Sequence, residues 1–350
     1  MNITENLKYL SELVAVAGFE KASAEKVAEL FKGCCDYVEV DKFSNVICIK
    51  KGTGNKAKKI MITAHIDEIG FLVRSIDEEG FVGITNIGGI DSKILLAQEV
   101  IIHGKQEIVG IIGATPPHLL KVEDAAKPVK IQDLYVDTGF TQNELKEIIS
   151  VGDTVSFKSK CNIMNEQKVS GKSFDNRASV ACLLEILENL KDIKHENDIV
   201  FVASTQEETS LVGIKTASYS LMPDAAIVID TCHGDIPDLS KDYSSTPGKG
   251  PEISIGPNLH PKMVNKLFEL GKEYFIPFQK MVEAGDTGTE AWATQVSTKG
   301  IPTVLLSIPI RYMHTAVETL NIEDIKFTAR LVAEFSKIGS TQLGDLVSIL

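Results

Sequence analysis

Apolar and polar residues follow two different patterns along this chain. Before Gly70 and again after Phe174, short apolar runs alternate with stretches whose apolar residues have helical spacing. A short apolar run between turn residues is typical of a buried strand, and strands that alternate with helices are typical of a mainly parallel sheet with helices on both faces. These two parts of the chain are therefore expected to form one α/β domain.

The elements expected in this domain can be given by residue range. Helices are predicted at 4–32 with a break near Gly18, Ala178–Leu190, Leu211–Tyr219, Pro261–Glu273, Thr289–Val296 and Ile322–Ile338. Strands are predicted at Tyr37–Val40, Val46–Ile49, Ile60–Thr63, Ile199–Ala203, Ala225–Ile229, Phe278–Val282 and Thr303–Ile308. The segment Asp238–Gly250, rich in Asp, Ser, Pro and Gly, is predicted to be a loop.

The stretch between these two parts has a different character, because short strand patterns crowd together and glycines interrupt them. The predicted strands are Phe71–Arg74, Phe81–Ile84, Glu99–His103, Ile108–Ile112 and Thr154–Phe157, with one helix at Thr141–Ile149. Frequent turn signals between short strands favour a small β unit. We therefore expect residues 71–164 to form an inserted β domain, and residues 1–70 and 165–350 to form a discontinuous catalytic domain.

Composition and charge exclude several classes of protein. The chain has 350 residues, of which 43% are apolar and 24% charged, so a packed core is expected and wholesale disorder is not. The formal net charge of −12 makes nucleic acid a poor partner, because a phosphate backbone needs a basic surface. No apolar run reaches the ~20 residues of a membrane helix, and the N-terminus lacks the pattern of a signal peptide. A cytoplasmic protein without membrane contact is expected.

The six cysteines are scattered at positions 34, 35, 48, 161, 182 and 232. None of them forms a Cys-x-x-Cys motif, which argues against a structural zinc knuckle. Cys48 lies in a strand pattern and Cys182 in a helix pattern. Both are expected to be small buried hydrophobic residues in a reducing cytoplasm.

Side chains that bind metals stand at the ends of the predicted apolar strands. Four apolar runs each lead into such side chains, and a further aspartate opens an apolar helix. Parallel sheets bind ligands outside the carboxyl ends of their strands, so these side chains are expected to meet at one edge. The candidates are His65, Asp67, Asp175, Glu207, Glu208, Asp230 and His314.

Four of the candidates form two pairs, and each pair has an ordinary alternative explanation. His65 and Asp67 could be a strand-end histidine with a solvated aspartate. Alternatively, one of the two side chains could bind metal while the other orients that ligand. Two adjacent acids such as Glu207 and Glu208 are common at a helix start, where the helix dipole favours anions. In a metal site the two acids divide the work, so we assign Glu208 as a ligand and Glu207 as a base that takes a proton.

The remaining candidates are weak one by one. Asp175 could simply be the N-cap of its helix. Asp230 ends a very apolar strand, where aspartate is disfavoured, and His314 stands alone. His233 lies close to Asp230 and is the chief rival as a histidine ligand. Only their joint placement on the same predicted edge favours a metal site.

The charges of the candidate ligands favour two metal ions over one. Asp175, Glu208 and Asp230 contribute three negative charges, while His65 and His314 are neutral ligands. Two divalent cations bring four positive charges, which leaves a surplus. A single cation under three carboxylates would be over-neutralised and a poorer Lewis acid.

Several segments together resemble one family, the tetrahedral glutamyl-aminopeptidase-like metallopeptidases, some members of which carry the name cellulase M. The order and spacing of the matching segments hold over essentially the whole chain. The segments are Ala64-His-Ile-Asp-Glu-Ile-Gly-Phe, Thr115-Pro-Pro-His, Asp133-Leu-Tyr-Val-Asp-Thr-Gly, Ser173-Phe-Asp-Asn-Arg, Gln206-Glu-Glu, Val228-Ile-Asp and Arg311-Tyr-Met-His.

The resemblance implies a fold and a role for each candidate. The fold is a three-layer α/β/α phosphorylase/peptidase-like domain with an inserted PDZ-like β-barrel. Asp175 would bridge two metal ions, with zinc expected first and cobalt or manganese as alternatives. The other implied ligands are His65 and Asp230 for one ion, and Glu208 and His314 for the other. Glu207 would be the general base, and Asp67 would orient His65.

The activity implied is that of an aminopeptidase acting on short peptides, in a homo-dodecamer built from dimers that form through the inserted domain. One position departs from the family: Glu290 stands where relatives usually have Asp after Gly-Thr, which puts substrate preference in question. Two other classes stay open. They are a metal-independent, endoglucanase-like glycoside hydrolase with two carboxylates, and a non-catalytic assembly that binds peptides.

Overall fold

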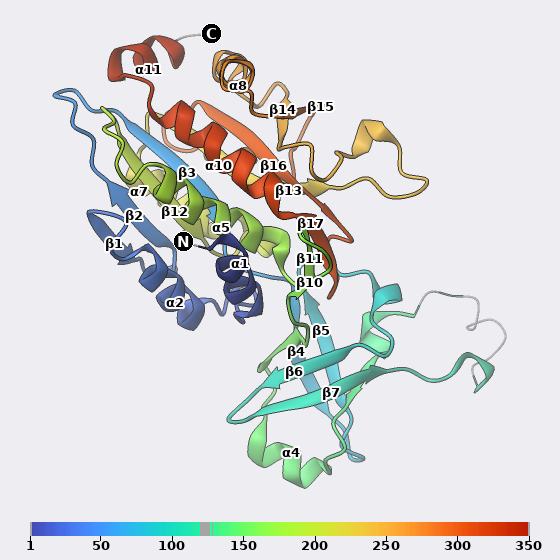
Figure 1. Cartoon of the computed structure of the whole chain (residues 1–350). Coiled ribbons are helices and arrows are strands. Elements are labelled where there is room, and N and C mark those ends of the chain that lie inside the picture. The colour runs from blue at the N-terminus through green and yellow to red at the C-terminus, as the bar shows by residue number, and fades with distance from the viewer. Residues whose placement is uncertain (1, 120–126, 128, 349–350) are drawn as a thin grey trace.

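Strand pairing divides the chain into a large mixed sheet and a closed barrel (Figure 1). The structure is a computed structural model that describes residues 2–119, 127 and 129–348. The barrel lies to one side of the α/β part and is joined to it by the chain segments next to β4 and β10. The predicted fold class, an α/β domain with an inserted β-barrel, is confirmed.

The large sheet contains 11 strands in the described residues, and nine of them follow the order β1-β2-β12-β3-β13-β16-β17-β11-β10. Its centre is parallel, because β3 pairs in parallel with β12 and β13, and β13 with β16. The strands at both ends pair antiparallel, while β14 pairs with β16 and β15 off the main path. The bounds are β1 Tyr37–Val40, β2 Val46–Lys50, β3 Lys59–His65, β10 Asn162–Ile163, β11 Lys168–Gly171, β12 Asp198–Ser204, β13 Ala225–His233, β14 Glu252–Ile255, β15 Gln279–Val282, β16 Thr303–Arg311 and β17 Glu318–Asn321.

Helices cover both faces of this sheet because the side chains of its central strands alternate between two apolar cores. In β3, Ile60 and Ile62 belong to the larger core with α1, α2, α5, α8 and α10, whereas Met61 belongs to a smaller core with α7 and α9. Figure 1 shows α5 and α10 crossing the larger-core face. The bounds are α1 Ile3–Glu12, α2 Lys21–Phe31, α5 Phe174–Asn189, α6 Glu207–Ser210, α7 Val212–Leu221, α8 Pro261–Glu273, α9 Glu290–Thr294, α10 Ile322–Ser336 and α11 Ser340–Leu346.

The barrel closes in the order β4-β5-β8-β7-β6-β9 around its own apolar core. Alternation within β7 shows how the sequence builds it: Ile108 and Ile112 are buried, while Val109 and Ile111 are exposed. All six strands lie between residues 70 and 157, and the exact domain limits stay a prediction. The bounds are β4 Gly70–Ile76, β5 Val82–Ile87, β6 Glu99–His103, β7 Glu107–Gly113, β8 Tyr135–Asp137 and β9 Thr154–Phe157, with α4 at Gln142–Ile148.

Several elements differ from the sequence predictions at their ends. The strand predicted at Ala225–Ile229 continues to His233, so Asp230 lies inside β13 and not after its end. The strands β8, β10, β11, β14 and β17 were not predicted, because each has at most four residues and none shows a long apolar run. The break near Gly18 is found where predicted, between α1 and α2.

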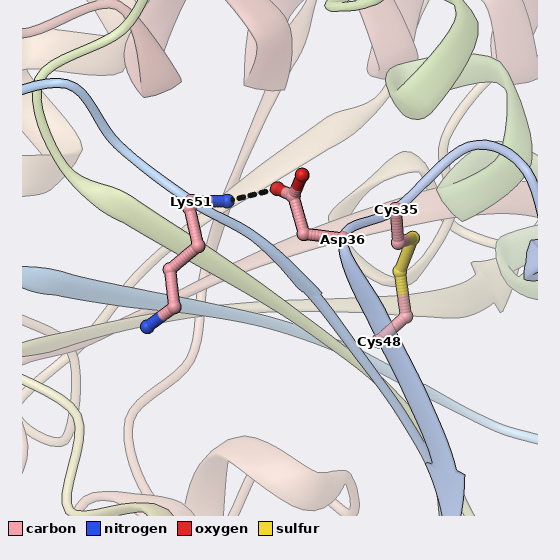
Figure 2. The surroundings of a disulfide bond; sticks show 4 residues. All are labelled: Cys35, Asp36, Cys48 and Lys51. Atoms are coloured by element: carbon pink, nitrogen blue, oxygen red, sulfur yellow. Dashed lines mark hydrogen bonds between the residues drawn. A yellow bond between two sulfur atoms is a disulfide. The ribbon is translucent and has the colours of Figure 1, made fainter.

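A disulfide joins Cys35, which precedes β1, to Cys48 in β2 (Figure 2). Cys48 is buried, as predicted, but the expectation of a reduced thiol is wrong. The Cα atoms of the two residues lie 6.1 Å apart, because the chain just before β1 still runs beside β2, where the Asp36 N–H donates to the Ile49 carbonyl at 2.9 Å. At the same end of the β1–β2 pair, the Lys51 backbone N–H donates to the Asp36 carboxylate at 2.7 Å. Cys182 is fully buried, as predicted.

Within the described residues, none of the helices combines the length and the apolar character that a bilayer span requires.

Candidate metal centre

The seven candidate side chains come from five segments that meet on one side of the parallel strands. His65 is the last residue of β3, and Asp67 follows it. Glu207 and Glu208 open α6, just after β12. The other three lie in or beside further elements: Asp175 at the start of α5, Asp230 within β13 and His314 after β16.

Five of these side chains form two groups that share one aspartate. In each group, one ligand atom from every member lies within 4.8 Å of the others. The first group is His65, Asp175 and Asp230, and the second is Asp175, Glu208 and His314. His233, the rival ligand, lines the neighbouring cavity with an exposed side chain but belongs to neither group.

The spacing of these atoms fits divalent cations. His65 Nε2 lies 3.3 Å from one oxygen of Asp175, and His314 Nε2 lies 3.4 Å from the other. The distance from His314 Nε2 to Glu208 is 3.2 Å, and from His65 Nε2 to Asp230 it is 3.8 Å. Two ligands bound ~2.1 Å from one tetrahedral zinc ion are roughly 3.4 Å apart, so the observed set could close on a metal with small movements.

The electrostatics of the site also favour bound cations. Burial raises the pKa of Glu207 to about 9, with help from the Asp230 and Glu208 carboxylates, and burial likewise raises the pKa of Asp230. Burial alone would lower the pKa of His314, but hydrogen bonds to Asp175 and Glu208 raise it to about 11. Without a cation, this cluster of acids therefore holds protons that a metal ion would displace.

Asp67 connects the two sides of the site through its carboxylate. It is fully buried, and its two oxygens accept hydrogen bonds from the backbone N–H groups of Glu207 and Glu208, both at 3.0 Å. One oxygen also lies 3.5 Å from His65 Nδ1, an atom that is buried without a hydrogen bond. Asp67 therefore fixes the start of α6 and is the nearest acceptor for the outer nitrogen of His65.

Glu318, at the start of β17, makes the same kind of contact on the other side of the site. Its two carboxylate oxygens accept hydrogen bonds from the backbone N–H groups of Asp175, at 3.0 Å, and His314, at 2.7 Å. It is almost completely buried. Glu318 was not among the residues predicted from the sequence. Its position four residues after His314 was the only signal for it, and that spacing is ordinary.

The inserted barrel also reaches this site. Gly88 and Gly89 follow β5, and the Gly89 carbonyl accepts a hydrogen bond from His314 Nδ1 at 2.7 Å, which leaves Nε2 to face the carboxylates. A Cβ on Gly88 would come within 2.7 Å of Ile69 and 3.3 Å of a Glu208 carboxylate oxygen. Gly88 also has a φ of +78°, a conformation that favours glycine. The sequence had suggested only a turn here.

A buried ionic network lies under the site. Glu68, next to Asp67, pairs with Lys172, and the Arg177 guanidinium lies nearby at 4.0 Å. The Arg177 Nε donates to the Ile66 carbonyl at 2.6 Å. Burial would raise the pKa of Glu68, but the charges of Lys172 and Arg177 hold it below its usual value. The network thereby fixes the backbone before Asp67 and around Asp175.

Glu290, the departure from the family pattern, is buried behind His65. Its carboxylate accepts a hydrogen bond from Thr63 at 2.6 Å and contacts the Ser204 hydroxyl. Burial raises its pKa. The loop before it, at Ala284 and Thr287–Thr289, lines a cavity of about 920 Å³ that opens beside Glu207 and the five candidate ligands. Glu290 belongs to neither group of candidate ligands in the described residues.

The contacts of Glu318 lead to a prediction about metal affinity. In Glu318→Gln, an amide N–H₂ would face one of the two backbone N–H groups, so one hydrogen bond would be lost and Asp175 and His314 would no longer be held together. We expect the dissociation constant of one of the two metal ions to rise about 10- to 100-fold. Titration with zinc against a chromophoric chelator would measure both constants. Glu323→Gln is the matched control, because Glu323 pairs with Lys326 away from the site. Unchanged constants in Glu318→Gln would contradict this role.

Comparison with known proteins places this geometry in a family. The family described as M42 glutamyl aminopeptidase matches residues 44–331. The lysyl aminopeptidase of Pyrococcus furiosus is 33% identical over 332 residues, which cover 93% of this chain and 94% of that protein. An aminopeptidase structure from Desulfurococcus kamchatkensis has a TM-score of 0.92 and 32% identity, and covers 99% of this chain and 98% of its own. The TET1 peptidase of Pyrococcus horikoshii, described as assembling into a tetrahedron or a large octahedral shell, has a TM-score of 0.83 and 30% identity, with 96% and 99% covered. The chain belongs to the M42 glutamyl aminopeptidase family and is a hydrolase that acts on peptide bonds.

Proposed function

We propose that the chain is a two-metal aminopeptidase that removes the N-terminal residue of short peptides, with Glu207 as its general base. The observation that carries this proposal is the sharing of Asp175 between two groups of candidate ligands. Glu207 stands beside both groups without belonging to either, and its Oε2 lies 3.9 Å from His65 Nε2.

The ligands proposed for the two ions follow from the groups. His65, Asp230 and Asp175 would hold the first ion, and Asp175, Glu208 and His314 would hold the second. A site of two imidazoles and three carboxylates accepts zinc, cobalt and manganese, and availability decides between them. We propose zinc as the first choice. Asp67 is proposed to orient His65, given the 3.5 Å between its carboxylate and Nδ1.

In this mechanism, Glu207 carries one proton through two successive transfers. Bound divalent cations supply the usual chemistry of such sites: they lower the pKa of water from ~15.7 toward ~7 and polarise a carbonyl. Glu207 takes the proton of the attacking water and later gives it to the leaving amine. The Glu207 backbone N–H donates to Asp67 at 3.0 Å, which fixes the start of α6 and holds the Glu207 carboxylate beside the candidate ligands, with Oε2 at 3.9 Å from His65 Nε2.

The charge around the site supports removal of terminal residues over internal cleavage. The free amino terminus of a peptide is a cation and needs acidic partners nearby, which the carboxylates of the candidate ligand groups can supply. A blocked amino terminus carries no charge, and it also adds bulk. We therefore expect peptides with a free amino group to be the substrates.

Self-association is part of the proposal. We propose a homo-dodecamer of dimers that form through the barrel. The support is the assembly described for the related TET1 peptidase, together with exposed apolar side chains on β7 such as Val109 and Ile111. A cytoplasmic location is proposed as well; the Cys35–Cys48 disulfide points the other way, because disulfides persist mainly in oxidising compartments.

The two alternative classes fit the site less well. A glycoside hydrolase needs two carboxylates flanking a sugar bond and no metal, whereas three of these carboxylates lie against histidine nitrogens, and the family is one of peptidases. The endoglucanase alternative is therefore wrong. A non-catalytic peptide-binding assembly would have no use for Glu207, which is partly buried beside the candidate ligands in a large cavity.

The experiment that tests the proposal compares peptides that differ only at the amino terminus. We expect the zinc-loaded protein to release the first residue from free peptides and amino-acid amides, and to leave the N-acetylated versions intact. Mass spectrometry of the products would show which bond is cut. Cleavage of the acetylated peptides at internal bonds, or no cleavage of any peptide, would contradict the proposal.

A further inference from the structure

The floor of the cavity beside the candidate metal centre is formed by side chains on one face of the sheet. It begins at Asp230 in β13 and continues across β16 and β14. Asp230 in β13 is aligned with Ser307 in β16, and Ser307 is aligned with Glu252 in β14. Residues aligned in this way point to the same face of a sheet. All three line the cavity, so a row of polar side chains extends away from the metal site over two further strands, roughly 10 Å at the usual strand spacing.

Two carboxylates belong to this floor. Glu252 is 3% exposed and accepts a hydrogen bond from the Ser245 hydroxyl at 2.7 Å. Glu283 follows β15, two residues after Met281, so both point to the cavity face, and both line it. Burial raises the pKa of Glu252, and the charge of Glu283 raises it further. Glu252 is aligned with Gln279, and the Glu283 backbone N–H donates to the Ile255 carbonyl at 2.8 Å, so the two acids stand at opposite ends of the short β14–β15 pair and on the same face.

The lysines that line the described part of this cavity do not neutralise these acids. Lys280 is adjacent to Met281 in β15, so its side chain points to the opposite face. Its ammonium lies 4.2 Å from the ring centre of Phe268, a residue of α8 in the larger-core layer. Lys241 is exposed at the rim next to Asp242, which offsets its charge. The floor keeps a net negative character.

A third polar group on the floor lacks a partner. Ser254 lies two residues after Glu252 in β14 and so points to the same face. Its side chain is fully buried and lines the cavity, and its hydroxyl oxygen has no hydrogen-bond partner. Buried hydroxyl groups are normally hydrogen-bonded, so an unpaired one facing a cavity next to two acids suggests a ligand that donates hydrogen bonds.

We propose that this floor binds the side chain of the N-terminal residue of the substrate and selects a cationic one, lysine or arginine. The inference rests on the proposed aminopeptidase function and adds the class of residue removed. An ammonium or guanidinium group would donate to Glu252, Glu283 and Ser254. An acidic side chain would meet two like charges, and an apolar one would leave these polar groups without partners.

The test measures kcat/KM of the metal-loaded protein on a matched set of p-nitroanilides of lysine, arginine, leucine, methionine and glutamate. We expect the lysine and arginine substrates to exceed the others by about tenfold or more, which is the effect of a charge-assisted hydrogen bond in a buried site. A preference for leucine, methionine or glutamate would overturn this inference while leaving the aminopeptidase function in place. Release from none of the substrates would overturn both.

Variants of the floor make the test specific. Glu252→Gln keeps the shape of the side chain and is expected to lower kcat/KM for lysine and arginine about 10- to 100-fold, with little change for leucine. Glu283 is only half-buried, so Glu283→Gln is expected to fold. It should change kcat/KM in the same direction, and it replaces Glu252→Gln in the test if that variant fails to fold. Glu273→Gln, an exposed acid at the end of α8, is the control. An equal loss for all substrates in both floor variants would show that Glu252 and Glu283 do not read the side chain.

Discussion

Replacing Glu207 by Gln is expected to lower kcat by about 10²- to 10⁴-fold while both metal ions stay bound. Gln has almost the same shape as Glu but cannot take a proton, so the change removes the general base and little else. Glu207 belongs to neither group of candidate ligands, although its Oε2 lies only 3.9 Å from His65 Nε2. KM should change much less than kcat, because the amide can still contact the substrate.

Two measurements separate this role from that of a ligand. Elemental analysis of Glu207→Gln after gel filtration should give the same metal content as the unchanged protein. Glu208→Gln is the matched comparison, because Glu208 belongs to the group with Asp175 and His314 and should lose metal as well as activity. If Glu207→Gln turned over substrate at the full rate, the assignment of the base would be wrong.

Removal of metal is expected to abolish peptide hydrolysis, and addition of zinc, cobalt or manganese is expected to restore it. The ligand groups contain five side chains that would be left without a cation. A chelator such as EDTA should therefore reduce turnover to background, and dialysis followed by each metal in turn would measure the recovery. Activity that survives complete removal of metal, checked by elemental analysis, would contradict the two-metal mechanism.

The affinity of the site for metal is expected to depend on pH, and the pKa values give the direction of the change. In the metal-free site the pKa of His314 is about 11 and that of Glu207 about 9, so both groups are protonated near pH 7. His314 must lose its proton before it can bind metal, so binding releases protons and affinity rises with pH. The dissociation constant for zinc, measured with an indicator whose own protonation is corrected for, should rise as the pH is lowered from about 8 to about 6. The opposite trend would contradict the role of His314 as a ligand.

The α/β part of the fold could be predicted because its strands are long apolar runs. The run that leads to His65 and the run that leads to Glu207 each end at the same edge, so parallel pairing was enough to bring the candidates together. Asp230 also reached the site, although β13 continues past it, because β13 pairs with β3 and aligns Val228 with Thr63, the residues two positions before Asp230 and His65.

Contacts made by isolated residues could not be predicted in the same way. Glu318 acts through two backbone N–H groups, and one of them belongs to Asp175, which lies 143 residues away in the sequence, so no local pattern indicates this contact. The floor acid Glu252 lies in a four-residue strand whose pairing with β16 is antiparallel and short. The Cys35–Cys48 disulfide depends on the register of β1 and β2, which the sequence does not specify on its own.

The hydrogen bond from His314 to Gly89 has a consequence for engineering. An inserted domain is often treated as a module that can be deleted or exchanged between relatives. Here the segment after β5 supplies the acceptor that fixes the ring of one histidine, and it passes close to Glu208. A chimera with a foreign barrel would need to reproduce this glycine pair, or the His314 ring would lose its alignment even if both pieces folded.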